Sequence, residues 1–232
     1  MKKRESLKAE MMSCSVKKEF THEGVTVLKF GAQYPQIRLE RNSAAQTRIN
    51  AHYLNTADSF FQYARKVLWE QAIEAQQEAQ KQGYPFFAFE AQLSDALTMN
   101  EDCTLSTYFD RYQYTGGAHG LTFRSSDNWS LDSGRRISMG SLFPRGVDYR
   151  KLVCEQIIVL ANQTMQQNPG IYFEEYKTLI LEYFNPTSFN LTPEGLMVYY
   201  QQYEIAPYVT GIVVFEIDYE KLCIRPPGCR GF

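Results

Sequence analysis

The stretch that decides the fold runs from Ser43 to Gly83, and its sequence is SAAQTRINAHYLNTADSFFQYARKVLWEQAIEAQQEAQKQG. Its apolar residues recur three or four positions apart, which places them on one face of a helix; they are Ile49, Tyr53, Ala57, Phe60, Phe61, Ala64, Leu68 and Ile73. Asn42 or Ser43 can cap the start, and Gly83 suits the end because glycine accepts a left-handed backbone. The spacing predicts one long helix over 44–82, whose polar part, 71–82, extends past the core.

Strand patterns lie on both sides of this helix. Before it, residues 25–30 and 34–39 are extended in pattern, and Pro35 indicates an edge strand or a break. After it, residues 84–131 resemble a meander of strands, broken at Asn100 to Asp102 and at Gly116-Gly117. In the last of these strands, alternation predicts that four apolar side chains share one face: Leu121, Phe123, Trp129 and Leu131.

The sequence pattern in the second half of the chain predicts further helices and a small sheet. Asp148 can cap a helix over 148–167, and a shorter helix follows around 173–183. A hairpin joins 189–191 to 196–201, and a last strand lies near 211–220. The predicted fold class is α+β: antiparallel sheets with one long helix in the N-terminal half and a second helix packed on one side, in two interlocked sub-domains.

Composition bounds the class of protein. The chain has 232 residues, of which 44% are hydrophobic and 22% charged, so disorder of the whole chain is excluded. The net charge of −2 gives no overall attraction for nucleic acid. The aromatic share of 14% indicates a β-rich core or tyrosines that face a partner. No run of about 18 apolar residues occurs and no signal peptide stands out, so the literal expectation is a cytoplasmic protein without a membrane span.

The chain divides into four predicted parts. Residues 1–19 form a basic arm, since 1–18 carry six Lys or Arg and two Glu; we expect it to be frayed or a short helix, with a membrane-surface or nucleic-acid tail as the alternative. An N-terminal module covers 20–100 and a C-terminal module 101–222. The tail is 223–232, and its residues 225–232 are expected to be loose.

Motifs for metal or cofactor binding are missing from the sequence. Its five cysteines form no C-x-x-C pair, and no histidine stands at zinc-ligand spacing, so we expect no metal and no cofactor. Cys223 and Cys229 could form a disulfide in an oxidising compartment, whereas the odd number of cysteines favours a reducing compartment or one stray thiol.

Three histidines are the candidates for acid–base chemistry. His22 and His52 fit solvated positions in a turn and on a polar helix face. His119 follows two glycines, so it could be a general acid or base on a flexible turn. It could equally sit in a glycine-permitted bulge and hydrogen-bond the backbone, and we favour this interpretation and a non-enzymatic protein.

Two segments carry a family resemblance. Residues 112–120, YQYTGGAHG, resemble the signature strand and turn of the RsiV family, and 191–196 with 203–211, LTPEGL and YEIAPYVTG, resemble its closing hairpin and loop. Residues 34–37 and 49–50 resemble the N-terminal module that also precedes the catalytic domain of the peptidoglycan deacetylase PdaC.

The resemblance implies a binding domain. RsiV-type proteins are membrane-anchored anti-sigma factors whose outer domain binds lysozyme, which leads to release of a sigma factor. This chain has neither a membrane helix nor a deacetylase domain, so lysozyme, another protein and a cell-wall glycan all stay open as partners. The resemblance places partner binding on two loops: Tyr114, Thr115, Gly116, Gly117, Ala118, His119, Pro207 and Tyr208. Pro207 stiffens its loop so that Tyr208 can insert into a partner, although Tyr208 could also pack on its own sheet.

Overall fold

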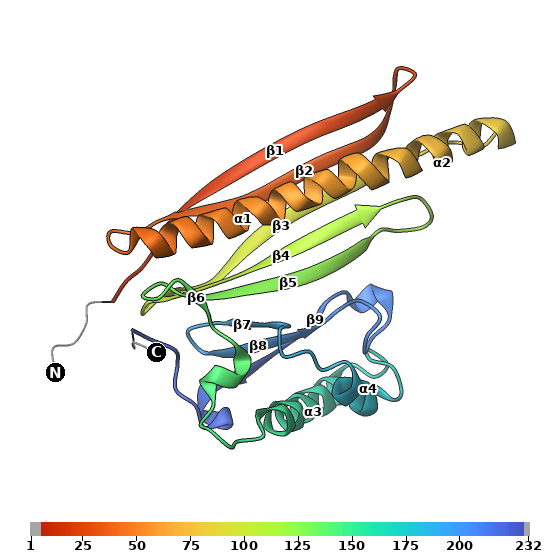
Figure 1. Cartoon of the computed structure of the whole chain (residues 1–232). Helices are drawn as coiled ribbons and strands as arrows, with labels where there is room; N and C mark the ends of the chain where they lie inside the picture. The colour runs from red at the N-terminus through yellow and green to blue at the C-terminus, as the bar shows by residue number, and fades with distance from the viewer. Residues whose placement is uncertain (1–5, 230–232) are drawn as a thin grey trace.

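A computed structural model describes residues 6–229, and it has two sheets with helices on their outer faces (Figure 1). The predicted α+β class is confirmed. The long helix comprises α1 (Ser43–Tyr63), a π-helical turn (Ala64–Leu68) and α2 (Trp69–Gln82). The side chain of Asn42 caps its start and Gly83, at φ 71°, ends it, as predicted.

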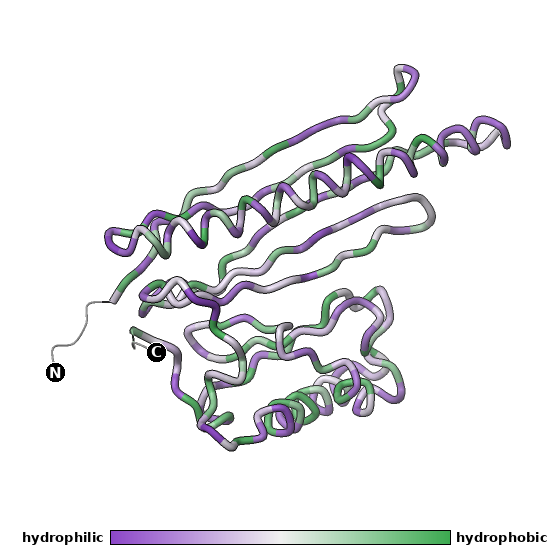
Figure 2. Tube along the Cα trace, viewed as in Figure 1, coloured by the Kyte–Doolittle hydropathy of each residue, from purple (hydrophilic) through white to green (hydrophobic). Residues whose placement is uncertain are grey.

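The long helix lies on one face of a six-stranded sheet ordered β1-β2-β3-β4-β5-β6. Its strands are β1 (Glu10–His22), β2 (Val25–Arg38), β3 (Phe89–Glu101), β4 (Thr104–Tyr114), β5 (Leu121–Ser130) and β6 (Arg135–Arg136). Neighbours are antiparallel except β2 and β3, which are parallel because the long helix carries the chain back between them. The apolar helix positions alternate with hydrophilic ones, and the last turns of α2 are hydrophilic and extend past the strands (Figures 1 and 2).

A second layer follows the sheet. Helix α3 (Tyr149–Gln167), capped by Asp148 as predicted, and the shorter α4 (Tyr176–Glu182) pack on a three-stranded sheet. That sheet has the order β7 (Phe189–Leu191), β8 (Gly195–Tyr200), β9 (Val213–Asp218). Two separate hydrophobic clusters result, one under the long helix and one around α3 and α4. The first sheet continues to Arg136, past residue 100, where the sequence places the boundary between the two modules. The division of the chain into these modules stays a prediction.

Polar side chains join the two layers. Thr107 points toward the long helix, where its hydroxyl meets that of Tyr53 at 3.1 Å. Its neighbour Ser106 points the opposite way, donates to Asn128 and accepts from Asn190 of β7. All of these residues are buried. The small sheet therefore packs on the face of the large sheet opposite the long helix, in an arrangement fixed by hydrogen bonds.

The expectation of a frayed N-terminal arm was wrong for residues 10–18. They belong to β1, which pairs along its length with β2 through a turn at Glu23 and Gly24, both at positive φ. Lys17 and Lys18 are exposed on this edge strand. Charge on an edge strand is compatible with pairing on its inner side and discourages pairing with other chains, which is why the basic composition was misleading.

The expectation of a loose segment over 225–232 was wrong at residue 229, since Cys229 is bonded to Cys103. The alternative of a Cys223–Cys229 disulfide is also wrong, because Cys223 is a free, exposed thiol. The partners Cys103 and Cys229 stand 126 positions apart, so spacing could not identify them. Residues 230–232, the end of the predicted tail, lie outside the residues that the structure describes.

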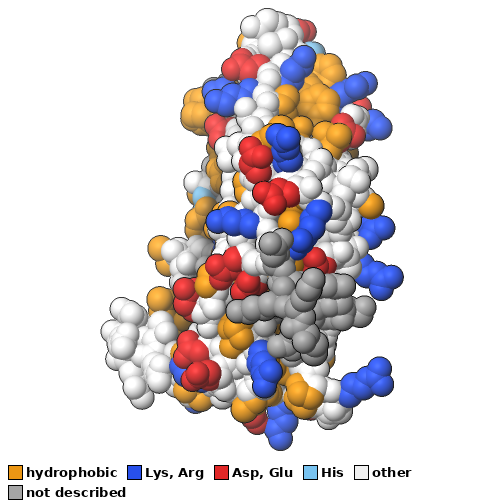
Figure 3. Space-filling model, turned by 90° about the vertical axis from the view of Figure 1, so that its left-hand side faces the viewer, with side chains coloured by type: hydrophobic (Ala, Val, Ile, Leu, Met, Phe, Trp, Pro, Cys, Tyr) orange, Lys and Arg blue, Asp and Glu red, His pale blue; other side chains and the backbone are white. Residues whose placement is uncertain are grey.

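No helix among residues 6–229 combines the length and the apolar composition that crossing a membrane requires. Figure 3 shows one side of the molecule, on which basic and acidic side chains are interspersed. That face offers no large patch of a single charge.

Candidate binding surface

The turn between β4 and β5 has the glycine-permitted shape that the sequence indicated. Gly116 and Gly117 have φ values of 97° and 85°, a region that other residues rarely adopt. The Tyr114 hydroxyl donates to the carbonyl of Gly117 at 3.1 Å and closes the turn. Residues Thr115 to His119 are exposed, whereas Tyr114 is half-buried.

The second predicted loop is held at its base and exposed at its tip. Ile205 and Ala206 are buried, and Thr210 donates its hydroxyl to the carbonyl of Ile171. Pro207, at φ −63°, begins a short 3-10 turn over Tyr208–Thr210. The tip residue Val209 is 89% exposed. A rigid loop of this kind can present side chains to a partner with little loss of entropy.

The two predicted segments meet. The rings of His119 and Tyr208 stack with centroids 3.6 Å apart and an interplanar angle of 14°. The ring of Tyr203 lies 5.9 Å from that of Tyr208. Tyr208 is half-buried by these contacts, so it packs on the other loop as well as facing outward. We call Thr115–His119, Tyr203 and Pro207–Val209 the His119–Tyr208 surface.

His119 contacts the backbone, as in the favoured interpretation. Its Nδ1 lies 3.3 Å from the carbonyl oxygen of Gly120. Within residues 6–229 it makes no hydrogen bond to a carboxylate that could form an acid–base pair. The alternative of His119 as a general acid or base therefore lacks an arranged partner in this structure.

A groove of about 620 Å³ borders the His119–Tyr208 surface. Its apolar wall includes Leu121 and Phe123, which are 53% and 54% exposed. The sequence predicted that these two side chains share one strand face with Trp129 and Leu131. Of the four, only Trp129 and Leu131 are buried. The missed signal was position: Leu121 and Phe123 stand at the start of β5 next to the glycine turn, where the outer edge of the strand is unpaired among the described residues.

A second hollow, of about 290 Å³, continues along β5, and most of the residues that line it are polar or charged. Arg124 makes two hydrogen bonds to Asp110, of 2.8 and 2.7 Å, and stacks over the ring of Tyr108. Burial would lower the pKa of Arg124, but the hydrogen bonds and charge of Asp110 raise it overall. Burial raises the pKa of the neighbouring Tyr199, partly offset by its hydrogen bond to Ser126.

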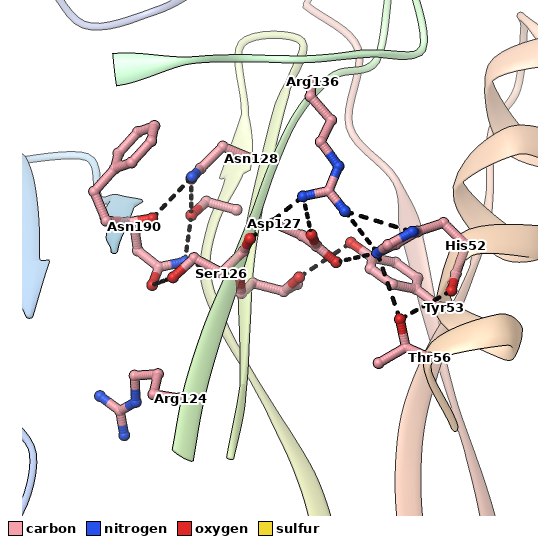
Figure 4. A network of polar contacts seen from close by, with 12 residues as sticks. His52, Tyr53, Thr56, Arg124, Ser126, Asp127, Asn128, Arg136 and Asn190 are labelled. Atoms are coloured by element: carbon pink, nitrogen blue, oxygen red, sulfur yellow. Dashed lines mark hydrogen bonds and ion pairs between the residues drawn. The ribbon is translucent and has the colours of Figure 1, made fainter. Parts of the chain in front are cut away.

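His52 is half-buried in a polar cluster at the end of this hollow, so the expectation of a solvated position holds only in part (Figure 4). Its Nε2 lies 2.7 Å from Asp127, which also pairs with Arg136. Arg136 Nη2 lies 2.7 Å from His52 Nε2. His22 also has a partner, since its Nδ1 meets the buried Gln76 at 2.9 Å. Both contacts join residues far apart in sequence.

One group of three side chains could in principle hold a metal among the described residues: Cys103, Asp132 and Cys229. The two cysteines are joined in the disulfide, so neither can supply the thiolate that a metal would need.

Comparisons with known proteins agree with the two-part architecture. Residues 22–122 match the family model described as "Deacetylase PdaC", and residues 140–220 match "Protein of unknown function (DUF3298)". The expected similarity to the PdaC module is thus confirmed, and the similarity to the RsiV family stays a prediction. No curated protein matches the sequence.

Two crystal structures of DUF3298-family proteins share the fold. The one from Bacteroides fragilis NCTC 9343 has a TM-score of 0.68 at 19% identity and covers 91% of both chains. The one from Pseudomonas aeruginosa PAO1 has a TM-score of 0.58 at 17% identity and covers 95% of both. At these identities the likeness concerns the fold alone.

Proposed function

We propose that this chain is a non-catalytic protein-binding domain whose partner docks on the His119–Tyr208 surface. The observation that carries the proposal is the stacking of His119 on Tyr208, because the RsiV resemblance selected both segments separately and the chain folds them together. Rigid aromatic side chains beside an apolar groove are typical of protein-binding sites.

Lysozyme is the first partner to test, because the RsiV resemblance implies it. A basic protein such as hen lysozyme also attracts acidic surfaces without specificity, and this chain is slightly acidic. Titration at two salt concentrations separates specific binding from unspecific charge attraction, because attraction between exposed charges is screened at high ionic strength.

The experiment is a calorimetric titration of the chain with hen lysozyme at about 0.15 M and about 1 M salt. We expect binding that survives high salt and is lost in Tyr208→Ala. Tyr183→Ala is the matched control, since Tyr183 is 43% exposed on the α4 side of the molecule and should bind like the wild type. Binding that disappears with salt, or that Tyr208→Ala leaves unchanged, would contradict the proposal.

A cell-wall glycan is the second candidate. The groove beside the surface combines Phe123 and Tyr203 with the amides of Gln113, Gln201 and Gln202, a mixture suited to a sugar. Titration with oligomers of N-acetylglucosamine distinguishes the candidates, because a glycan site would release heat with these oligomers and a lysozyme site would not.

The disulfide supports action in an oxidising compartment, outside the cytoplasm that the sequence suggested. Disulfides persist in secreted and periplasmic proteins and are rare in the reducing cytosol. Location after fractionation of the source cells, with the disulfide trapped by alkylation, tests this part of the proposal.

A further inference from the structure

Strand β5 has a free edge over most of its length. The short β6 pairs only with Trp129 and Ser130, and within residues 6–229 no strand pairs with the outer edge between Thr122 and Ser126. Backbone groups at such an edge are ready to pair with another strand.

Side chains occupy this edge in place of a strand. The amide of Gln201 accepts a hydrogen bond from the Arg124 N–H at 2.9 Å and donates one to the Arg124 carbonyl at 2.8 Å. A residue of an added strand would make the same pair of bonds. Gln202 accepts from the Thr122 N–H at 2.6 Å, and Arg136 donates to the Ser126 carbonyl at 3.4 Å.

The hollows described above form one groove along this edge. The hollow of about 620 Å³ and that of about 290 Å³ share Arg111, Phe123 and Gln201. Side chains of an added strand would alternate between the Phe123 side and the Tyr199 side, because successive side chains of a strand point to opposite faces.

Arg111 favours a negatively charged side chain in the bound segment. It lines both hollows, and its Nε is buried with no hydrogen-bond partner among the described residues. A buried unpaired donor on a cation is costly, and a carboxylate is the group that satisfies an arginine best.

We propose that the free edge of β5 receives an extended segment of the partner protein, which adds as a strand and places a carboxylate at Arg111. Gln201 and Gln202 occupy the strand positions until the segment displaces them. Main-chain bonds supply affinity and Arg111 supplies selectivity. The inference rests on the proposed function, because it gives the protein partner of the same surface a mode of binding.

The probe is a short peptide of alternating threonine and valine with one central aspartate, titrated into ¹⁵N-labelled protein and followed by NMR. We expect the amide signals of Thr122 and Arg124 to shift most. Gln201→Ala should bind the peptide roughly tenfold tighter, because no amide has to be displaced. Gln166→Ala, an exposed change on α3, should bind like the wild type.

Two matched peptide series complete the test. N-methylation at successive peptide positions should abolish binding at every second position, as strand pairing requires. Replacing the aspartate by asparagine should weaken binding to the wild type but not to Arg111→Gln. Equal binding by Gln201→Ala and wild type, no alternation in the methylated series, or no aspartate preference would each overturn the inference.

The outcome is independent of lysozyme. Failure of the lysozyme titration with success of the peptides would overturn the partner and not the strand-binding edge. Lysozyme binding with failure of the peptides would leave the His119–Tyr208 surface in place and overturn strand addition.

Discussion

The rings of His119 and Tyr208 lie almost parallel with their centroids 3.6 Å apart, although one follows β4 and the other follows β8. The pair joins the glycine turn of the large sheet to the proline loop of the small sheet. Neither loop alone would form a continuous surface, so the packing of the two layers is what creates the proposed site.

Tyr208→Ala should cost little stability. Tyr208 is half-buried in a loop, and an aromatic pair contributes about 0.5–1.5 kcal/mol beyond burial. We expect urea denaturation to show a loss of about 1 kcal/mol in the free energy of unfolding, and Tyr208→Phe to lose less because it keeps the ring. A loss above about 3 kcal/mol, the size typical of removing a core aromatic, would show that Tyr208 serves the fold.

Asp127→Asn should destabilise the fold clearly. The Asp127 side chain is 6% exposed and pairs with both His52 and Arg136, so neutralising it leaves two partners without their anion. We expect a loss of about 2–3 kcal/mol by urea denaturation. Asp58→Asn is an exposed change on the same helix as His52. It should change the free energy of unfolding by less than about 0.5 kcal/mol. Equal effects of the two substitutions would contradict a structural role for the cluster.

Asp95→Asn should stabilise the protein at neutral pH. Burial raises the pKa of Asp95, partly offset by a hydrogen bond from Gln33, and its Oδ1 is buried without a partner. Because the folded-state pKa lies above the unfolded value, the contribution of Asp95 is complete below the unfolded pKa and is lost as pH rises through the folded pKa.

The measurement is urea denaturation across the acidic range up to neutral pH. The free energy of unfolding of Asp95→Asn should rise relative to that of the wild type as pH rises. The difference at neutral pH should be less than about 1 kcal/mol. Asp102→Asn, in an exposed turn, is the control and should follow the wild type. A gain that does not depend on pH would contradict the raised pKa.

Reduction of the Cys103–Cys229 disulfide should destabilise the fold by about 2–4 kcal/mol, because it releases a long closed loop. Cys229→Ser should show the same loss without a reducing agent, and Cys223→Ser should show none. Thiol titration of the folded protein should label Cys223 first. Burial raises the pKa of Cys154 to about 11, so Cys154 should react only on unfolding. Rapid labelling of Cys103 without reduction would contradict the bond.

Local patterns explain which features the sequence could predict. The long helix, its caps at Asn42 and Gly83, and the helix after Asp148 follow from spacing and capping chemistry within a few residues. The exposed glycine turn is also local, because Gly116 and Gly117 need positive φ. The family resemblance selected the segments of His119 and Tyr208 separately, and no local pattern indicated that the two rings stack.

Contacts between distant residues explain what the sequence could not predict. The partners of His52 come from β5 and β6, and the partner of Cys229 is Cys103, which lies 126 positions earlier in the turn between β3 and β4. The basic strand β1 was missed because an edge strand tolerates charge that a buried strand would not. The exposure of Leu121 and Phe123 depends on the place of β5 at the edge of the sheet, which the local pattern does not show.

NMR mapping of ¹⁵N-labelled protein with unlabelled hen lysozyme at high salt tests whether a partner docks on the His119–Tyr208 surface. We expect the largest shifts and line broadening on Thr115–His119, Tyr203 and Val209, with α3 and the β1–β2 hairpin unchanged. Shifts that fall elsewhere, or no shifts at all, would contradict the claim that the stacked loops form the binding surface.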